Sequence, residues 1–191
     1  MSRAAESMNL TGKFLIAMPG MGDPRFEKAL ILVCAHSADG AMGLIVNKPM
    51  REPGFPRLLE QLGITPGPAC ASVPVMFGGP VESGRGFVLH SPDYAAEDGT
   101  LAIGERFGMT ATLQVLEDMS HGAGPDQALL ALGYSGWGPG QLESEIGQNG
   151  WLSCDARTEI VFSRDAGGKW ERALKTLGVD ALTLSATAGR A

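Results

Sequence analysis

The chain has 191 residues, of which 44% are hydrophobic and 19% are charged, a balance that excludes intrinsic disorder and fits a folded protein. We therefore predict a single domain over residues 1–191, with an ordered core of about residues 10–185. The formal net charge of -6, together with scattered basic residues, weighs against binding to the phosphate backbone of nucleic acids.

Apolar runs and turn residues divide the first half of the chain into short elements. The continuous apolar run Ala29–Ala35 predicts a buried strand, and Asp39-Gly40 after it predicts a hairpin turn. Phe55–Leu62 has apolar residues at helical spacing and ends at Gly63, so it predicts a helix. The other strands expected in this half are Lys13–Met18, Ala41–Asn47, Val73–Phe77 and Gly86–His90.

The second half of the chain mixes helices and strands in the same way. The helices expected there are Gln114–Met119, Pro139–Asn149 and Trp170–Leu177, and the strands are Leu101–Ile103, Ala128–Leu132, Trp151–Cys154 and Glu159–Phe162. Strands outnumber helices, and the early strands follow each other without a helix between them. This order favours an α+β fold over a doubly wound α/β sheet.

No segment of the sequence has the length of a membrane span or of a secretory leader. The longest apolar run, Ala29–Ala35, is far shorter than the ~20 residues that a spanning helix needs. The apolar stretch near the N-terminus, Phe14–Met18, is too short for a signal peptide. We therefore expect a cytoplasmic protein without membrane contact.

The three cysteines, Cys34, Cys70 and Cys154, form no CxxC pair, and their number is odd. This pattern indicates reduced thiols and argues against a disulfide framework or a zinc site. Cys70 lies in a loop rich in proline and glycine, so we expect it to be the most exposed of the three. No cofactor or metal ion is predicted.

Ser135 lies in the segment "LGYSGWGPGQLE", which resembles a strand, a sharp glycine turn and a helix. A nucleophile elbow needs glycine two residues after the serine, and Trp137 occupies that position here. In enzymes with this elbow the catalytic histidine follows the serine in the chain, whereas all three histidines here precede Ser135. We therefore interpret the segment as the start of a helix, with Gly138 as N-cap and Pro139 in the first turn, and not as a catalytic centre.

The predicted helix 139–149 carries a row of polar residues at i, i+4 spacing. Gln141, Glu145 and Asn149 form this row at the edge of the apolar face made by Leu142 and Ile146. A carboxylate at a core boundary is usually hydrogen-bonded, so these residues either support neighbouring loops or line a binding site. Other polar residues at strand ends or in turns raise the same question, namely Asp23, His36, Asn47, Lys48 and His90.

Five linked motifs resemble the YqgE/AlgH family. They are "GKFLIAMPGMGDPRF" (12–26), "GAMGLIVNKP" (40–49), "FGGPV" (77–81), "GFVLH" (86–90) and "LGYSGWGPGQLESEIGQNGWL" (132–152). The resemblance implies a mixed, bifurcated β-sheet folded into a pseudo-barrel with flanking helices. It also implies recurrent polar positions at Asp23, His36, Asn47, Lys48, His90, Gln141, Glu145 and Asn149. The family is largely uncharacterised, and some members carry a transcriptional-regulator label.

Two main functions and one further alternative follow from these observations. We prefer a binding or regulatory module, with a pocket between the "MPGMGDP" loop, Asn47-Lys48 and the start of the 139–149 helix, suited to a small anion or to an acidic group of a protein partner. The alternative is an enzyme that uses His36 or His90 with Glu145 as an acid–base pair. A DNA-associated regulator is a third hypothesis, against which the charge and the lack of a basic recognition helix argue.

Overall fold

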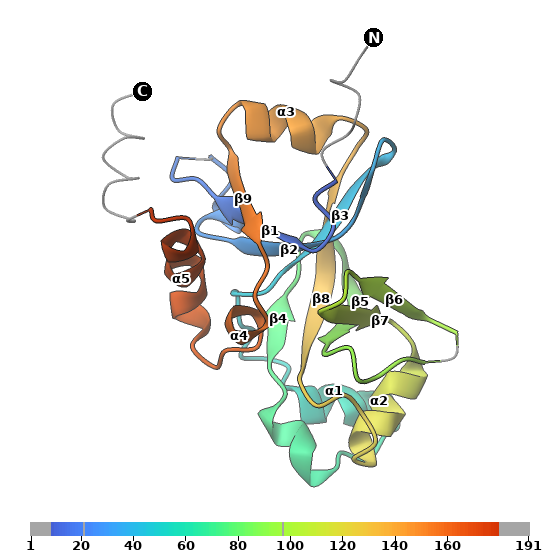
Figure 1. The fold of residues 1–191 in the computed structure, drawn as a ribbon. Helices are drawn as coiled ribbons and strands as arrows, with labels where there is room; N and C mark the ends of the chain where they lie inside the picture. The colour runs from blue at the N-terminus through green and yellow to red at the C-terminus, as the bar shows by residue number, and fades with distance from the viewer. Residues whose placement is uncertain (1–8, 21, 97, 180–191) are drawn as a thin grey trace.

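One nine-stranded sheet organises the computed structural model, which describes residues 9–20, 22–96 and 98–179 (Figure 1). The strands follow the spatial order β6-β7-β5-β8-β3-β2-β1-β9, and β4 lies beside β8 outside this path. Neighbours pair antiparallel except β4 and β8, which run parallel. The strands are β1 (Lys13–Ala17), β2 (Leu30–Ser37), β3 (Gly40–Ile45), β4 (Val75–Phe77), β5 (Val81–His90), β6 (Thr100–Ile103), β7 (Phe107–Thr110), β8 (Ala128–Trp137) and β9 (Trp151–Asp155).

The sheet divides into two branches along β8. The first part of β8, from Leu130 to Leu132, pairs with β4, whereas Ser135 to Trp137 pairs with β3. Gly133 lies between the two parts with φ +74°, and a Cβ at this position would lie 2.3 Å from the carbonyl oxygen of Gly79. Only glycine tolerates both this backbone conformation and this approach, so Gly133 marks the bifurcation that the family resemblance implies.

The helices flank the curled sheet at its ends and on one side (Figure 1). In Figure 1, α1 and α2 lie at the lower end, α3 crosses the upper end, and α4 and α5 lie together on the left. Their bounds are α1 (Phe55–Gln61), α2 (Leu113–Ser120), α3 (Gln141–Gly147), α4 (Thr158–Val161) and α5 (Lys169–Thr176), with short 3-10 turns η2 (Pro24–Phe26), η3 (Pro68–Ser72) and η4 (Ala166–Gly168). The expected α+β class and curled, bifurcated sheet are confirmed.

Three apolar clusters fill the space between the sheet and the helices. Alternate residues of β1 and β2 point to opposite faces of the sheet, as strand geometry requires. Phe14, Leu30 and Leu32 join the central cluster with α4 and α5. Leu15 and Ile31 join a second cluster with Leu142 of α3, Trp137 and Trp151. The third cluster lies between α1, α2 and β5 and includes Phe55, Leu59, Val88, Val115 and Leu130.

Two predictions for the C-terminal half of the chain are wrong, one in the type of element and one in where a strand ends. The segment Glu159–Phe162 was expected as a strand but forms α4, because the consecutive side chains of Ile160 and Val161 are both buried in the central cluster. A strand would point one of them outward. The strand expected to end at Leu132 continues to Trp137, since the glycines interpreted as a turn lie within β8. The strand β7 was not predicted at all.

The start of α3 also differs from the expectation. Gly140 has φ +72° and is the N-cap, so the helix begins at Gln141 and not at Pro139. The left-handed conformation of Gly140 cannot lie inside a helical turn, which moves Gly138 and Pro139 into the preceding loop. The apolar face is as predicted, with Leu142 buried and Ile146 packed against the second cluster.

Candidate functional site

A cleft lies between residues 18–20 and 22–26, which follow β1, and one side of α3. Its volume is about 940 Å³, within the range of small-molecule sites. Four of the eight predicted site residues line this α3 cleft, namely Asp23, Gln141, Glu145 and Asn149. The remaining walls come from the ends of β5, β8 and β9 and from residues that the sequence analysis did not single out as site residues, among them Arg25, Phe26, Trp137, Gln148 and Trp151.

Glu145 is held rigidly in the wall of the cleft by three donors. Its Oε1 accepts hydrogen bonds from the indole nitrogens of Trp137, at 3.1 Å, and Trp151, at 2.9 Å. Its Oε2 accepts one from the amide nitrogen of Gln141, at 2.9 Å. The Gln141 carbonyl oxygen in turn accepts the backbone N–H of Gly138, at 2.9 Å. A carboxylate has about four acceptor sites, so this network leaves room for one further donor.

The opposite wall contains an ion pair within one turn. Asp23 accepts bidentate hydrogen bonds from Arg25, at 3.0 Å from Nε and 2.8 Å from Nη2, and also accepts the Arg25 backbone N–H at 3.0 Å. The Arg25 side chain, followed by its backbone amide, holds the pKa of Asp23 below its usual value, and Asp23 raises the pKa of Arg25. The turn therefore keeps both charges at the mouth of the cleft.

Aromatic rings connect the two walls of the cleft. Trp151 contacts Phe26 edge to face at a centroid distance of 5.8 Å, and it contacts Trp137 in the same manner at 6.0 Å. Trp151 and Trp137 are 2% and 7% exposed. Phe26 and Trp137 are thus joined through Trp151 into one aromatic layer in the lining of the cleft.

Asn47 and Lys48 bind the backbone that follows residues 22–26 and do not line the cleft. Asn47 accepts the backbone N–H of Leu30 and donates to the carbonyl of Lys28, both at 2.8 Å. The ammonium group of Lys48 donates a hydrogen bond to the backbone carbonyl of Glu27. Both side chains therefore fasten the segment 27–30, and the expected lysine contribution to the pocket is not formed.

His36 connects the N-terminal segment to α3. Its Nδ1 accepts the backbone N–H of Leu10 at 3.0 Å, so the proton lies on Nε2, which donates to Glu143 at 2.5 Å. His36 and Cys34 lie two residues apart in β2 but do not share a face of the strand. The pairing of β2 with β3 shifts between Val33 and Ala35, which is a bulge, and the bulge reverses the alternation of side chains.

His90 lies at the other end of the sheet, fully buried. Its Nδ1 donates to the carbonyl of Ser91 at 2.7 Å, so Nε2 accepts the hydroxyl of Thr110 at 2.8 Å, and Thr110 accepts the hydroxyl of Thr100 at 2.7 Å. Burial lowers the pKa of His90, so the imidazole is neutral in this chain of hydrogen bonds. His90 therefore ties β5 to β6 and β7, far from Glu145 in the fold.

Neither histidine forms the acid–base pair with Glu145 that the alternative hypothesis needs. The hydrogen bonds of Glu145 come from Trp137, Trp151 and Gln141, and His36 contacts Glu143 instead. Ser135 is 1% exposed and donates to the carbonyl of Gly78 at 3.3 Å, which removes it from any surface site. Among the residues that the structure describes, no group of three or more His, Cys, Asp or Glu side chains is placed to hold a metal ion.

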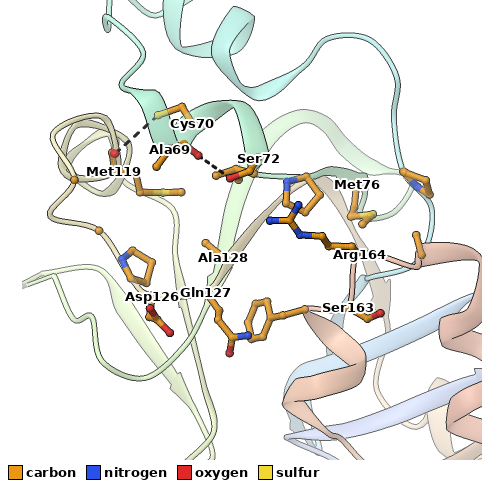
Figure 2. A pocket seen from close by; sticks show the side chains of 18 residues that line it. Ala69, Cys70, Ser72, Met76, Met119, Asp126, Gln127, Ala128, Ser163 and Arg164 are labelled. Carbon is orange, nitrogen blue, oxygen red and sulfur yellow. Dashed lines mark hydrogen bonds between the residues drawn. The ribbon is translucent and has the colours of Figure 1, made fainter.

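A second hollow of about 590 Å³ lies between η3, the loop after α2 and the loop after α4 (Figure 2). Its lining includes Arg164, Asp126 and Cys70 and none of the eight predicted site residues. Cys70 was expected to be exposed but is only 1% exposed, because η3 packs it against Met119 of α2. The prediction for Cys70 is therefore wrong. Cys34 is buried, in agreement with the buried strand predicted over Ala29–Ala35.

The residues that the sequence analysis missed, above all Arg25 and Trp151, have weak local signals. Arg25 lies two residues after Asp23 in a turn, and Trp151 lies six residues after Glu145 at the start of a strand. Two tryptophans flanking a helix with one boundary carboxylate are the only sequence pattern that points to this network. Their convergence depends on the helix folding back over the sheet.

The chain is similar over nearly its full length to proteins of several bacteria. A UPF0301 protein of Ruegeria pomeroyi is 62% identical over 185 residues, covering 96% of this chain and 100% of the relative. A UPF0301 protein of Cereibacter sphaeroides is 56% identical over 184 residues, again covering 96% and 100%. Within the described residues, no helix has the length and apolar character to cross a membrane.

Solved structures share the fold. The solution structure of the AlgH protein from Pseudomonas aeruginosa has a TM-score of 0.78 and 38% identity and covers 95% of this chain and 96% of its own. A protein of Corynebacterium diphtheriae has a TM-score of 0.67 at 18% identity, over 87% of this chain and 86% of its own, and this likeness concerns the fold alone. The AlgH-like family matches residues 14–182, and the chain belongs to this family.

Proposed function

We propose that the protein is a cytoplasmic regulatory module whose ligand site is the α3 cleft. The observation that carries this proposal is the Glu145 carboxylate, which two indole N–H groups and the Gln141 amide hold in the wall of a cleft of about 940 Å³. A polar group that is fixed before a ligand arrives loses little conformational entropy on binding. Such an arrangement suits recognition, and it needs no bond-breaking group.

The charges of the cleft favour a ligand that donates hydrogen bonds. Arg25 and Asp23 neutralise each other, whereas the three donors to Glu145 are uncharged. The lining therefore carries one uncompensated negative charge, and the ammonium of Lys48 is bound to Glu27 outside it. We propose a small molecule with an amino or guanidino group in place of the expected anion.

The hydrogen bonds of the two histidines favour binding over acid–base catalysis. His36 and His90 each have both ring nitrogens occupied by protein partners. A general base needs a free nitrogen within reach of the substrate proton, directly or through one water. A catalytic role for either imidazole would require one of these hydrogen bonds to break first.

The test is a thermal-shift and NMR titration of the whole chain with three panels of small molecules. The panels contain primary amines and guanidines, carboxylates and phosphates, and neutral sugars. We expect compounds of the first panel to raise the melting temperature and to shift the indole N–H resonances of Trp137 and Trp151. The Glu145→Gln variant should weaken binding by about tenfold, because it removes the negative charge.

Glu60→Gln is the matched control, since Glu60 is exposed on α1 and lies outside the cleft. It should bind like the unchanged protein. Stabilisation by anions alone would overturn the proposed ligand class, and binding that Glu145→Gln leaves unchanged would overturn the proposed site. Salt-dependent binding to duplex DNA would favour the DNA-associated alternative instead.

A further inference from the structure

A further cavity, chemically different from the α3 cleft, lies beneath α1 and α2. These helices cover the end of the sheet where β5 and β8 run side by side, at the lower end of Figure 1. Between them and the sheet is a cavity of about 360 Å³, here called the α1/α2 cavity. It shares no lining residue with the α3 cleft, so its role is independent of the function proposed above.

The lining of the α1/α2 cavity is mostly apolar, and its polar or charged side chains are those of Gln61, Arg85, Thr110 and Thr112. The sheet contributes Val88, Leu130 and Leu132, and the helices contribute Phe55, Leu58, Leu59, Leu62, Leu113 and Leu116. Arg85 is the one charged residue of the lining, and its guanidinium lies 5.0 Å from the ring centroid of Phe87. Phe87 belongs to the central cluster on the opposite face of β5, so the charge points away from the cavity.

Two leucines of the lining are unusually exposed. Leu62 is 52% exposed and Leu113 is 57% exposed, and each stands at an end of its helix, where the cavity opens. Exposure of a single leucine is ordinary, but two of them beside one apolar cavity form a continuous apolar surface. Covering such a surface with an apolar group lowers the free energy of the system.

One polar group of the lining has no partner. The Oγ1 of Thr112 is buried and makes no hydrogen bond with any residue that the structure describes. Thr112 is the N-cap of α2, where a threonine hydroxyl ordinarily accepts a backbone N–H of the first turn, but its side chain makes no such bond. A buried hydroxyl left in this state destabilises the protein. Because this oxygen is closed off from the cavity in the structure, a ligand oxygen would satisfy it after the Thr112 side chain rotates toward the cavity.

We propose that the α1/α2 cavity binds one aliphatic chain with a carbonyl or carboxyl head group, which accepts a hydrogen bond from Thr112. At the packing density of protein interiors, 360 Å³ accommodates a chain of roughly ten carbons. The volume lies at the lower end of the range for small-molecule sites. A partner helix, with a diameter of about 10 Å, needs more space than this cavity offers. The size and the lack of inward charge therefore favour an acyl chain over a protein segment.

The test uses the full chain with decanoate, decanol and hexanoate as probes, followed by calorimetry and by NMR of the leucine methyl groups. We expect decanoate and decanol each to bind with a stoichiometry of one and to shift the methyl resonances of Leu62 and Leu113. Both should bind at least tenfold more tightly than hexanoate. Decanol carries no charge, so comparable binding of the two separates chain recognition from charge recognition. An equal effect of a phospholipid vesicle would identify a lipid acyl chain as the source.

Two variants locate the site. A Cβ on Gly86 would lie 3.3 Å from Leu130 Cδ1 and 3.7 Å from Leu132 Cδ2, so Gly86→Val fills the cavity and should lower decanoate affinity at least tenfold. Thr112→Val keeps the shape of the side chain but removes the hydroxyl, and should weaken decanoate several-fold while raising the melting temperature of the free protein. Leu101→Ala removes an exposed leucine of β6 outside the cavity, and it should leave the affinities for decanoate and decanol unchanged.

Three results would overturn the proposal. One is the absence of saturable decanoate and decanol binding. Another is binding that Gly86→Val and Thr112→Val both leave at its original strength, which would place the probe elsewhere. The third is a dimer in sedimentation that Leu62→Glu or Leu113→Glu dissociates while decanoate fails to bind, which would assign this face to a second copy of the chain.

Discussion

The indole of Trp151 donates its N–H to Oε1 of Glu145 over 2.9 Å, so the first residue of β9 is fastened back to the helix that precedes it. Trp137, the last residue of β8, donates to the same oxygen. One carboxylate thus joins two strands of the sheet that are not neighbours, and it does so in the wall of the α3 cleft. The residue that shapes the proposed ligand site also stabilises the fold around it.

Replacing Glu145 should therefore reduce stability as well as ligand binding. Glu145→Ala leaves two largely buried indole N–H groups without an acceptor, which should lower the free energy of unfolding by about 2–4 kcal/mol. Glu145→Gln keeps one acceptor oxygen and should cost about 1 kcal/mol. Urea unfolding followed by tryptophan fluorescence measures both, and Glu60→Ala, at an exposed position of α1, should stay within about 0.5 kcal/mol of the unchanged protein.

The bifurcation of the sheet should depend on Gly133. Gly133→Ala places a Cβ 2.3 Å from the carbonyl of Gly79 at a left-handed φ, and it should cost roughly 3 kcal/mol or prevent folding. Gly84→Ala is the matched control, because a Cβ at Gly84 meets no atom within 4 Å. Circular dichroism and urea unfolding compare the two, and equal stability of both variants would contradict the assigned role of Gly133.

Lys169 should make stability rise with pH in the alkaline range. Its ammonium is fully buried and donates to the carbonyls of Val46 and Val161 at 2.8 and 2.7 Å. Burial lowers its pKa from 10.5 to about 8. Between these values the unfolded chain binds more protons than the native one, so the free energy of unfolding should increase with pH, by roughly 3 kcal/mol at most.

The measurement is urea unfolding at several pH values between 7 and 10.5, compared with two variants. Lys169→Met should remove the alkaline increase and lower stability at pH 7 by about 2 kcal/mol, because two buried carbonyls lose their donor. Lys175→Met changes an exposed lysine on the same helix and should retain the increase. An increase that persists in Lys169→Met would show that another group causes it.

Glu143 should contribute to acid sensitivity. A hydrogen bond to its own backbone amide, followed by the contact with His36, holds the pKa of Glu143 below its ordinary value of 4.5. A depressed native pKa stabilises the fold above the unfolded value, and this contribution disappears as the pH falls through the native pKa. Glu143→Gln should therefore flatten the loss of stability below about pH 4.5, while Glu60→Gln should leave the acid limb unchanged.

Much of the secondary structure could be predicted because its signals are local. The apolar run of β2, the Asp-Gly turn after it and the stop at Gly63 lie within a few residues of what they specify. The segment Glu159–Phe162 failed for the same reason, since four residues with an apolar centre fit a strand or a helical turn equally well. The burial of Ile160 and Val161 in the central cluster made the choice.

In the candidate site, too, local features could be predicted from the sequence and contacts between distant segments could not. The helical period by itself predicts Gln141, Glu145 and Asn149 in one row. In the structure α3 ends at Gly147, so Asn149 lies beyond the helix with φ +62°, and it still lines the α3 cleft together with Gln141, Glu145 and Asp23. The partners of Glu145, the capture of His36 by Glu143 and the diversion of Asn47 and Lys48 to the segment 27–30 depend on strands distant in sequence. Local periodicity determined which side chains share a face, whereas only the curl of the bifurcated sheet decided which faces meet, because a hydrogen bond needs two groups within about 3 Å and chain spacing does not set that distance.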